Sequence, residues 1–124
     1  MAGAAVVAVA RSFVGTPYRN GGAAPGGFDC SGFTRYVFAQ VGVALPRTVQ
    51  EQATAGKHVD RRDLRAGDLV FFAIDGRTIS HVGILVSAGA FVHAPGSRSS
   101  LREESLSLAY WQTRYAAARR VVRR

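Results

Sequence analysis

The apolar residues of this chain repeat with two different periods, and the change between them falls near residue 56. In the first half, apolar residues recur every three to four positions, which is the helical period. In the second half, short runs rich in Val, Phe and Ile are separated by turns that contain Gly, Asp or Ser, as in β-strands. Helices followed by strands joined through short turns are typical of an α+β domain.

The predicted helices cover residues 4–14, a segment from Ser31 to a stop at Gly42, and a short stretch over 48–55. A long Gly/Pro loop over 15–27 separates the first two. The predicted strands cover residues 69–74, 78–86, 90–94, 101–103 and 117–122. A short helix or turn is predicted at 110–115, before the last strand. The "DG" pair at 75–76 is a hairpin signal. We therefore expect helices packed on an antiparallel β-meander.

The chain has a single cysteine, Cys30, in the segment "FDCSGF" at 28–33. Asp29 stands where the N-cap of the second helix belongs, so Cys30 lies in the first turn of that helix. Unpaired N–H groups and the helix dipole favour an anion there, which lowers the pKa of a thiol and makes it a nucleophile. The ordinary alternative is a small buried hydrophobic residue.

Two histidines lie on neighbouring predicted strands, and a meander can bring them within hydrogen-bond reach. One of them, His81 or His93, would then act as base for the thiol while the other orients it. Their even separation of twelve residues does not decide whether they share a face, because the turn between the strands also matters. Gly83 is expected to leave room beside His81 for another helix or a substrate. Each histidine alone is more often a core or edge residue.

The composition bounds the class of partner. Sixteen basic and eight acidic residues give a net charge of +8, which favours nucleic acid, acidic lipid or an acidic cell-wall polymer without choosing among them. No stripe of interleaved aromatic and basic residues supports specific nucleic-acid binding. No apolar run approaches the roughly 18 residues of a membrane span. One cysteine and three dispersed histidines lack the close ligand pairs of a metal site, so no metal or cofactor is expected.

A further set of motifs carries a resemblance to a known family. The segments "GTPYRNGG", "FDCSGF", "LPRT", "RAGDLVFF", "SHVGILV" and "FVHAPGSR" follow one another here, between about Phe13 and Val122, as they do in NlpC-type cysteine peptidases. The resemblance implies a papain-like fold and an enzyme that cuts peptidoglycan stem peptides in the cell envelope or after secretion. We expect one catalytic domain over 1–124 without the separate binding domain that is common in relatives. Charge would substitute for that domain, or the chain is a catalytic domain cut from a longer protein, or it rides on a partner such as a phage-tail assembly.

The same resemblance assigns roles to residues. It implies Cys30 as nucleophile, His81 as base and His93 as the residue that orients His81. Tyr18 would help the Cys30 backbone N–H to stabilise an oxyanion, although it could also only pack its loop. The residues expected to border the substrate cleft are Asp29, which could meet a free amino group, Ser31 and Ser80. Arg47 could face the substrate or form a structural ion pair, and we favour the ion pair.

The implied reaction is hydrolysis of the bond between γ-linked D-glutamate and a diamino acid, through an acyl-enzyme on Cys30. Two alternatives stay open. A thiol-dependent acyltransferase or amidase would share the acyl-enzyme and differ in acceptor or substrate. A non-catalytic cell-wall binding module would keep the fold alone.

Overall fold

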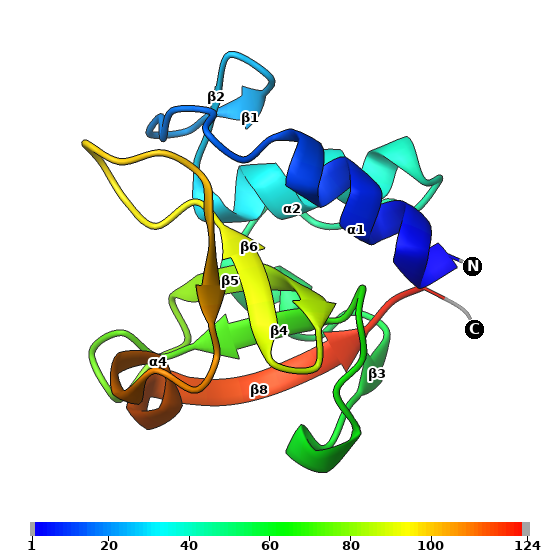
Figure 1. The fold of residues 1–124 in the computed structure, drawn as a ribbon, viewed down its shortest axis with the longest axis vertical. Helices are drawn as coiled ribbons and strands as arrows, with labels where there is room; N and C mark the ends of the chain where they lie inside the picture. Colours follow the sequence, from blue (N-terminus) through cyan, green and yellow to red (C-terminus); the bar gives the residue numbers. More distant parts are fainter. Residues whose placement is uncertain (1, 123–124) are drawn as a thin grey trace.

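The computed structural model describes residues 2–122 (Figure 1). The helices in this range are α1 (Ala2–Ser12), α2 (Cys30–Gln40), α3 (Val49–Gln52), the 3-10 helix η1 (Arg61–Asp63) and α4 (Ala109–Arg114). The strands are β1 (Ala23–Ala24), β2 (Gly27–Phe28), β3 (Lys57–His58), β4 (Leu69–Phe72), β5 (His81–Ser87), β6 (Ala90–His93), β7 (Arg102–Ser105) and β8 (Tyr115–Arg120). Helices α1 to α3 precede the strands of the large sheet, and the mixture of helices with an antiparallel sheet confirms the predicted α+β class.

A six-stranded antiparallel sheet with the order β3-β8-β4-β5-β6-β7 organises the fold, and β1 and β2 form a separate small hairpin. Strands β4 to β7 are the predicted meander. The last strand departs from it: β8 does not follow β7 in the sheet but pairs with β4, on the other side of the meander (Figure 1). Helix α4 lies between β7 and β8 in the chain, so the segment that contains it connects β7, at one edge of the sheet, to β8 beside β4.

The hairpin indicated by the "DG" pair at 75–76 is present, because β4 and β5 pair antiparallel, but its connection is longer than predicted. Strand β4 ends at Phe72 and β5 begins at His81, so the connection is the longer loop 73–80. Within it, Asp75 accepts hydrogen bonds from the backbone N–H groups of Arg77 and Thr78, and Gly76 has a φ of +78°. The "DG" pair therefore forms a local turn inside the loop. Strands β1 to β3 and η1 were not predicted, because elements of two or three residues show no periodicity.

The sheet is covered on both faces. Helices α1 and α2 lie side by side against one face, where Phe33, Val37 and Phe38 of α2 are fully buried (Figure 1). The other face packs against Leu64, Leu106 and Trp111, which come from loops and α4. All four residues of β4 and the first six of β5 are therefore buried, without the alternation of a half-exposed sheet. This places the start of α2 directly against β5.

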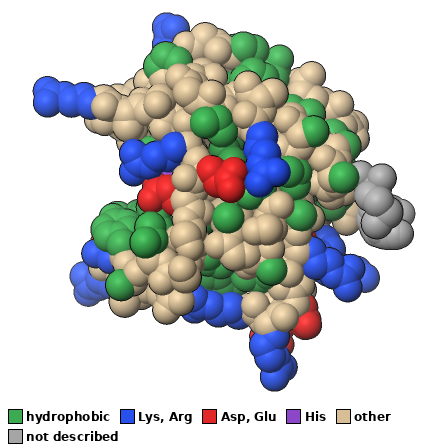
Figure 2. All heavy atoms as spheres, in the orientation of Figure 1, with side chains coloured by type: hydrophobic (Ala, Val, Ile, Leu, Met, Phe, Trp, Pro, Cys, Tyr) green, Lys and Arg blue, Asp and Glu red, His purple; other side chains and the backbone are tan. Residues whose placement is uncertain are grey.

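The charges are dispersed over the surface. On the face drawn in Figure 2, Lys and Arg side chains lie both around the outline and in the middle, where acidic side chains lie next to them. They do not gather into one stripe on that face. None of the helices within residues 2–122 has the length and apolar character to cross a bilayer.

Candidate active site

Helix α2 begins at Cys30, and its start is fixed by the segment before it. The Asp29 side chain caps the helix by accepting a 2.7 Å hydrogen bond from the Gly32 N–H, as predicted. The Asp29 N–H donates to the Gly22 carbonyl at 2.9 Å. That carbonyl also lies against Gly32, where a Cβ would overlap with it. Gly32 therefore allows the glycine-rich loop to pack directly on the first turn of α2.

The expected ion pair of Arg47 is present. Its guanidinium donates to both carboxylate oxygens of Asp29, at 2.8 and 3.2 Å, and to the Ser31 hydroxyl oxygen at 2.9 Å. The hydrogen bond to Asp29 raises the pKa of Arg47 above its usual value. The two predicted cleft residues that flank Cys30 are thus held together by one cation, and the Asp29 charge is already paired.

The two histidines share one face of the sheet. Their ring nitrogens, His81 Nε2 and His93 Nδ1, are 2.7 Å apart. Ile84 of β5 pairs with Val92 of β6, so position 83, two residues from His81, lies opposite His93. The two histidines are therefore diagonal neighbours on the same face of the sheet. His93 is fully buried and His81 is nearly so. The juxtaposition that the sequence left open is therefore realised.

The thiol of Cys30 lies beside the strand that carries His81. The backbone N–H groups of Val82, Ser31 and Cys30 lie near the sulfur and act to lower its pKa, as expected at a helix start. Burial is the larger effect, and the nearby charge of Asp29 adds to it, so the pKa of the Cys30 thiol is raised. The prediction of a lowered thiol pKa is wrong in its net direction, because the helix start is covered by the sheet.

Burial acts on the histidines in the opposite sense. It lowers the pKa of His81 to about 3, with the neighbouring His93 adding to the effect, and the pKa of His93 to about 4. Near neutral pH the site therefore holds a neutral thiol and two neutral imidazoles. Such a site is suited to transferring the thiol proton to an imidazole during attack.

Gly83 was expected to leave room beside His81 for another helix or a substrate, and this prediction is wrong. A Cβ at this position would lie 2.8 Å from a ring carbon of Phe91 and 3.2 Å from the Val92 carbonyl oxygen. The room beside Gly83 is filled by strand β6, which leaves none for another helix or a substrate. Gly83 instead allows the close approach of β5 and β6 that brings the two histidines together.

Two further residues complete the polar network, and the sequence analysis did not find them. Glu104 Oε2 is 2.6 Å from His93 Nε2, and its carboxylate also accepts from Arg102 and from the buried indole N–H of Trp111. The Trp111 ring stacks on His81, with centroids 5.7 Å apart and an interplanar angle of 21°. The one sequence signal for Glu104 was its position directly after the predicted strand 101–103. That prediction ended one residue short of it.

The remaining predicted residues lie around this network. Burial raises the pKa of Tyr18, and the neighbouring Cys30 and Asp29 add to the increase. The Tyr18 hydroxyl stays a donor at neutral pH. Ser80 is exposed next to His81, and its hydroxyl accepts from the Ile74 N–H at 3.3 Å, closing the loop 73–80.

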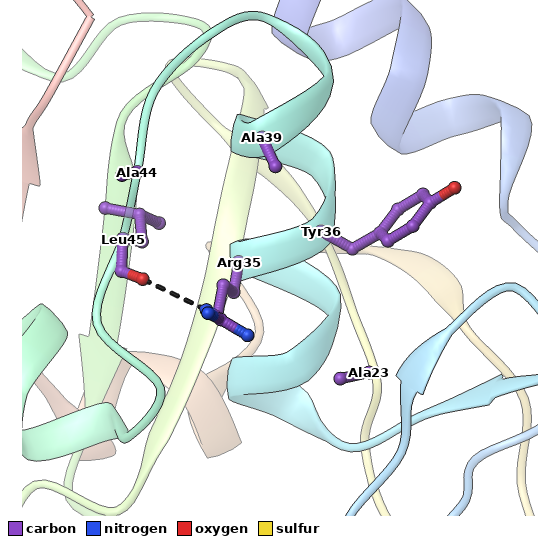
Figure 3. Close-up of a pocket in the computed structure, with 6 residues that line it drawn as sticks. All are labelled: Ala23, Arg35, Tyr36, Ala39, Ala44 and Leu45. Carbon is purple, nitrogen blue, oxygen red and sulfur yellow. Dashed lines mark hydrogen bonds between the residues drawn. The ribbon is translucent and has the colours of Figure 1, made fainter.

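A surface hollow of about 260 Å³ lies elsewhere, alongside α2, with Arg35, Tyr36 and Leu45 among its lining residues (Figure 3). Arg35 crosses it and donates to the Leu45 carbonyl at 3.2 Å. Its lining holds no candidate catalytic residue, so we keep it apart from the active site. Within residues 2–122, no group of three or more His, Cys, Asp or Glu side chains is placed to hold a metal ion.

The buried histidines predict acid-sensitive stability. Their folded-state pKa values, about 3 for His81 and about 4 for His93, lie below the 6.5 of a free histidine. The unfolded chain therefore binds more protons as the pH falls below 6.5, and the free energy of unfolding decreases by up to about 1.4 kcal/mol per pH unit per histidine. Urea unfolding between pH 7.5 and 4.5 measures this slope. A His93→Asn variant should lose part of it; an unchanged slope would contradict the account.

Comparison with known proteins identifies the family. The model of the NlpC/P60 family matches residues 15–120, which is most of the chain. The chain belongs to the NlpC/P60 family. Among solved structures, an NlpC/P60 family protein from Bacillus cereus ATCC 10987 superimposes with a TM-score of 0.93 over 98% of this chain and 40% of that one, at 33% identity. The papain-like fold expected from the sequence motifs is therefore confirmed.

Curated NlpC/P60 relatives have names that describe wall peptidases. The chain is 47% identical over 111 residues to "Murein DD-endopeptidase MepS/Murein LD-carboxypeptidase" of Escherichia coli K12, covering 89% of this chain and 58% of that protein. It is 41% identical over 110 residues to "Gamma-D-glutamyl-L-lysine dipeptidyl-peptidase" of Bacillus subtilis 168, covering 87% and 37%. The chain thus spans less than two thirds of the length of these relatives.

Proposed function

We propose that this chain is a cysteine endopeptidase that hydrolyses peptidoglycan stem peptides. The observation that carries the proposal is the approach of Cys30, at the start of α2, to strand β5, where Val82 lies at its sulfur and the adjacent His81 pairs with His93. A thiol, a base and a group that orients the base are the parts of covalent acyl transfer. Membership of the NlpC/P60 family and the names of the relatives supply the substrate class.

The first step forms the acyl-enzyme. As the sulfur of Cys30 attacks the peptide carbonyl carbon, the thiol proton passes to Nδ1 of His81, the ring nitrogen that does not contact His93. The tetrahedral intermediate collapses when its C–N bond breaks, and His81 returns the proton to the leaving amine. A thioester on Cys30 and a free amine result.

The second step releases the acyl group. Water attacks the thioester carbonyl while His81 takes one of its protons, and the C–S bond breaks to give a carboxylic acid and the Cys30 thiol. In both steps the carbonyl oxygen gains negative charge. The backbone N–H of Cys30, at the start of the helix, and the hydroxyl of Tyr18 are the donors proposed to stabilise that charge.

For the bond cleaved, we propose the one between γ-linked D-glutamate and the diamino acid that follows. Asp29 lies next to Cys30 and can accept a hydrogen bond from a free amino group at the start of a short stem fragment, while Arg47 and Ser31 shape that end of the site. The B. subtilis relative is named for a γ-D-glutamyl bond. The second candidate is a DD bond, which the name of the 47% identical E. coli relative favours.

The positive net charge fits a substrate that is attached to anionic polymers. A charge of +8 attracts the anionic polymers of a cell wall at long range, so it can concentrate the enzyme at the cell envelope. We propose the envelope or the extracellular wall as the site of action. No residue described here supports association with a phage tail, and we do not propose it.

The proposal predicts soluble products from insoluble peptidoglycan. The protein is incubated with purified sacculi; the supernatant is then examined by mass spectrometry for released peptides, and the pellet is assayed for bound protein. We expect peptides whose new ends are a free carboxyl group and a free amine. A non-catalytic binding module would pellet with the sacculi, release nothing and leave the cross-links of the pellet intact, which would contradict the proposal.

The same experiment separates hydrolysis from transfer. With glycinamide added as a competing acceptor, a transferase would give acyl products heavier by the added amine, whereas a hydrolase gives mainly the free acid. An amidase that acts on the glycan–peptide junction would release whole stem peptides. Each alternative left open by the sequence therefore has its own product mass.

A further inference from the structure

The hydrogen bonds of the site form one chain that continues beyond His93. It runs from His81 Nε2 to His93 Nδ1 over 2.7 Å and from His93 Nε2 to Glu104 Oε2 over 2.6 Å. Strand register explains the second link: His93 pairs with Arg102, so Glu104 is its diagonal neighbour on the same face. Both bonds involve at least one ring nitrogen, which donates or accepts depending on whether it carries the proton.

Glu104 is held as a carboxylate that only accepts. Burial alone would raise its pKa, but hydrogen bonds from Arg102, His93 and Trp111 together lower it. Its two oxygens receive three donors: Trp111 on Oε1 at 3.2 Å, and Arg102 at 2.9 Å together with His93 on Oε2. The partner nitrogen, His93 Nε2, must therefore carry a proton.

That proton fixes the rest of the chain. A neutral imidazole has one N–H, so His93 Nδ1 carries a lone pair and accepts the hydrogen bond from His81. His81 then carries its proton on Nε2, which leaves Nδ1 free to act as a base. The burial that keeps the pKa of His93 at about 4 excludes a second proton on this ring at neutral pH.

We infer that Glu104 is a positioning residue that sets the tautomers of His93 and His81, so that Nδ1 of His81 is the base for Cys30. The inference rests on the proposed function for its effect on catalysis, since Glu104 touches neither the thiol nor the substrate in that mechanism. Trp111 supports the arrangement from two sides, because it donates to Glu104 and stacks on His81.

Glu104→Gln is the informative substitution because it keeps the shape and replaces one oxygen with an NH2 group. The Trp111 donor is buried and cannot turn to solvent, whereas Arg102, whose side chain is 53% exposed, can. The amide oxygen therefore stays on Trp111 and the NH2 group faces His93. His93 Nε2 must then accept, which reverses both tautomers and places a proton on His81 Nδ1.

We expect Glu104→Gln to lower kcat by about 10- to 100-fold, as for other residues that orient a catalytic group, and to change KM by less than about twofold. Glu103→Gln is the matched control. It removes the same charge from the adjacent residue of β7, whose carboxylate bonds Arg11 at the surface. A general effect of charge or folding would lower the activity of both variants, and equal kcat losses would overturn the inference.

Imidazole ¹⁵N NMR of the protein tests the tautomers directly, with the exposed His58 as reference. We expect the proton on Nε2 in both His81 and His93 of the wild type. A proton on Nδ1 of His81 would overturn the inference, as would a Glu104→Gln variant with unchanged tautomers and unchanged kcat. Because this spectrum needs no substrate, it decides the inference even if the protein cleaves no peptide and the proposed function fails.

Discussion

Replacing Cys30 with alanine is expected to abolish peptide cleavage, with kcat lowered on the order of 10⁴-fold or more. The thiol forms the covalent intermediate, and no other described side chain beside His81 offers a nucleophile of this kind. The stability effect should be small, since the thiol is only partly buried and forms no disulfide. Initial rates on a stem peptide and urea unfolding curves of the same samples measure both quantities.

Cys30→Ser is the matched variant for this experiment. It keeps a hydroxyl nearly in the place of the sulfur, but a neutral imidazole at His81 activates an alcohol far less readily than a thiol. We therefore expect it to be as inactive as Cys30→Ala within tenfold. Cleavage near the wild-type rate in either variant would contradict the role of Cys30.

Replacing Gly32 with alanine is expected to lower the free energy of unfolding by about 3 kcal/mol. The added Cβ would overlap with the Gly22 carbonyl oxygen and lie 2.9 Å from the capping oxygen of Asp29. Relief of this overlap requires the glycine-rich loop to move away from α2, which breaks the hydrogen bond between Asp29 and Gly22. Urea unfolding followed by circular dichroism measures the change.

Gly26→Ala is the control for Gly32→Ala. Gly26 belongs to the same glycine-rich segment, but a Cβ there meets nothing within 4 Å, and its φ is not positive. Its unfolding midpoint should stay close to the wild type. If the two variants unfolded at the same urea concentration, the tight contact at the start of α2 would not have the importance given to it here.

The residues that sequence analysis placed correctly are those whose position follows from local rules. Asp29 has the residue type and spacing of an N-cap, so the first turn of α2 and the place of Cys30 could be predicted. The histidines lie on strands with strong apolar patterns, and these strands were found within a few residues of their ends. The motifs shared with NlpC-type peptidases added the catalytic roles of the thiol and the imidazole, which stay predictions.

The parts that could not be predicted depend on contacts distant in sequence. Glu104 reaches His93 only because the register of β6 and β7 makes them diagonal neighbours, and nothing in the local sequence sets that register. The upward shift in the pKa of Cys30 depends on how deeply the sheet covers the helix start. The pairing of β8 with β4 likewise depends on packing distant in sequence, on the face of the sheet opposite α1 and α2.

The most direct test of the central claim is mass spectrometry of a defined stem tetrapeptide after incubation with the wild-type protein and with Cys30→Ala. We predict two fragments from the wild type, separated between D-glutamate and the diamino acid, and intact peptide from the folded variant. Fragments from Cys30→Ala at the wild-type rate would contradict the claim. The claim would also be contradicted if well-folded wild-type protein left both the tetrapeptide and a cross-linked dimer, tested beside it, intact.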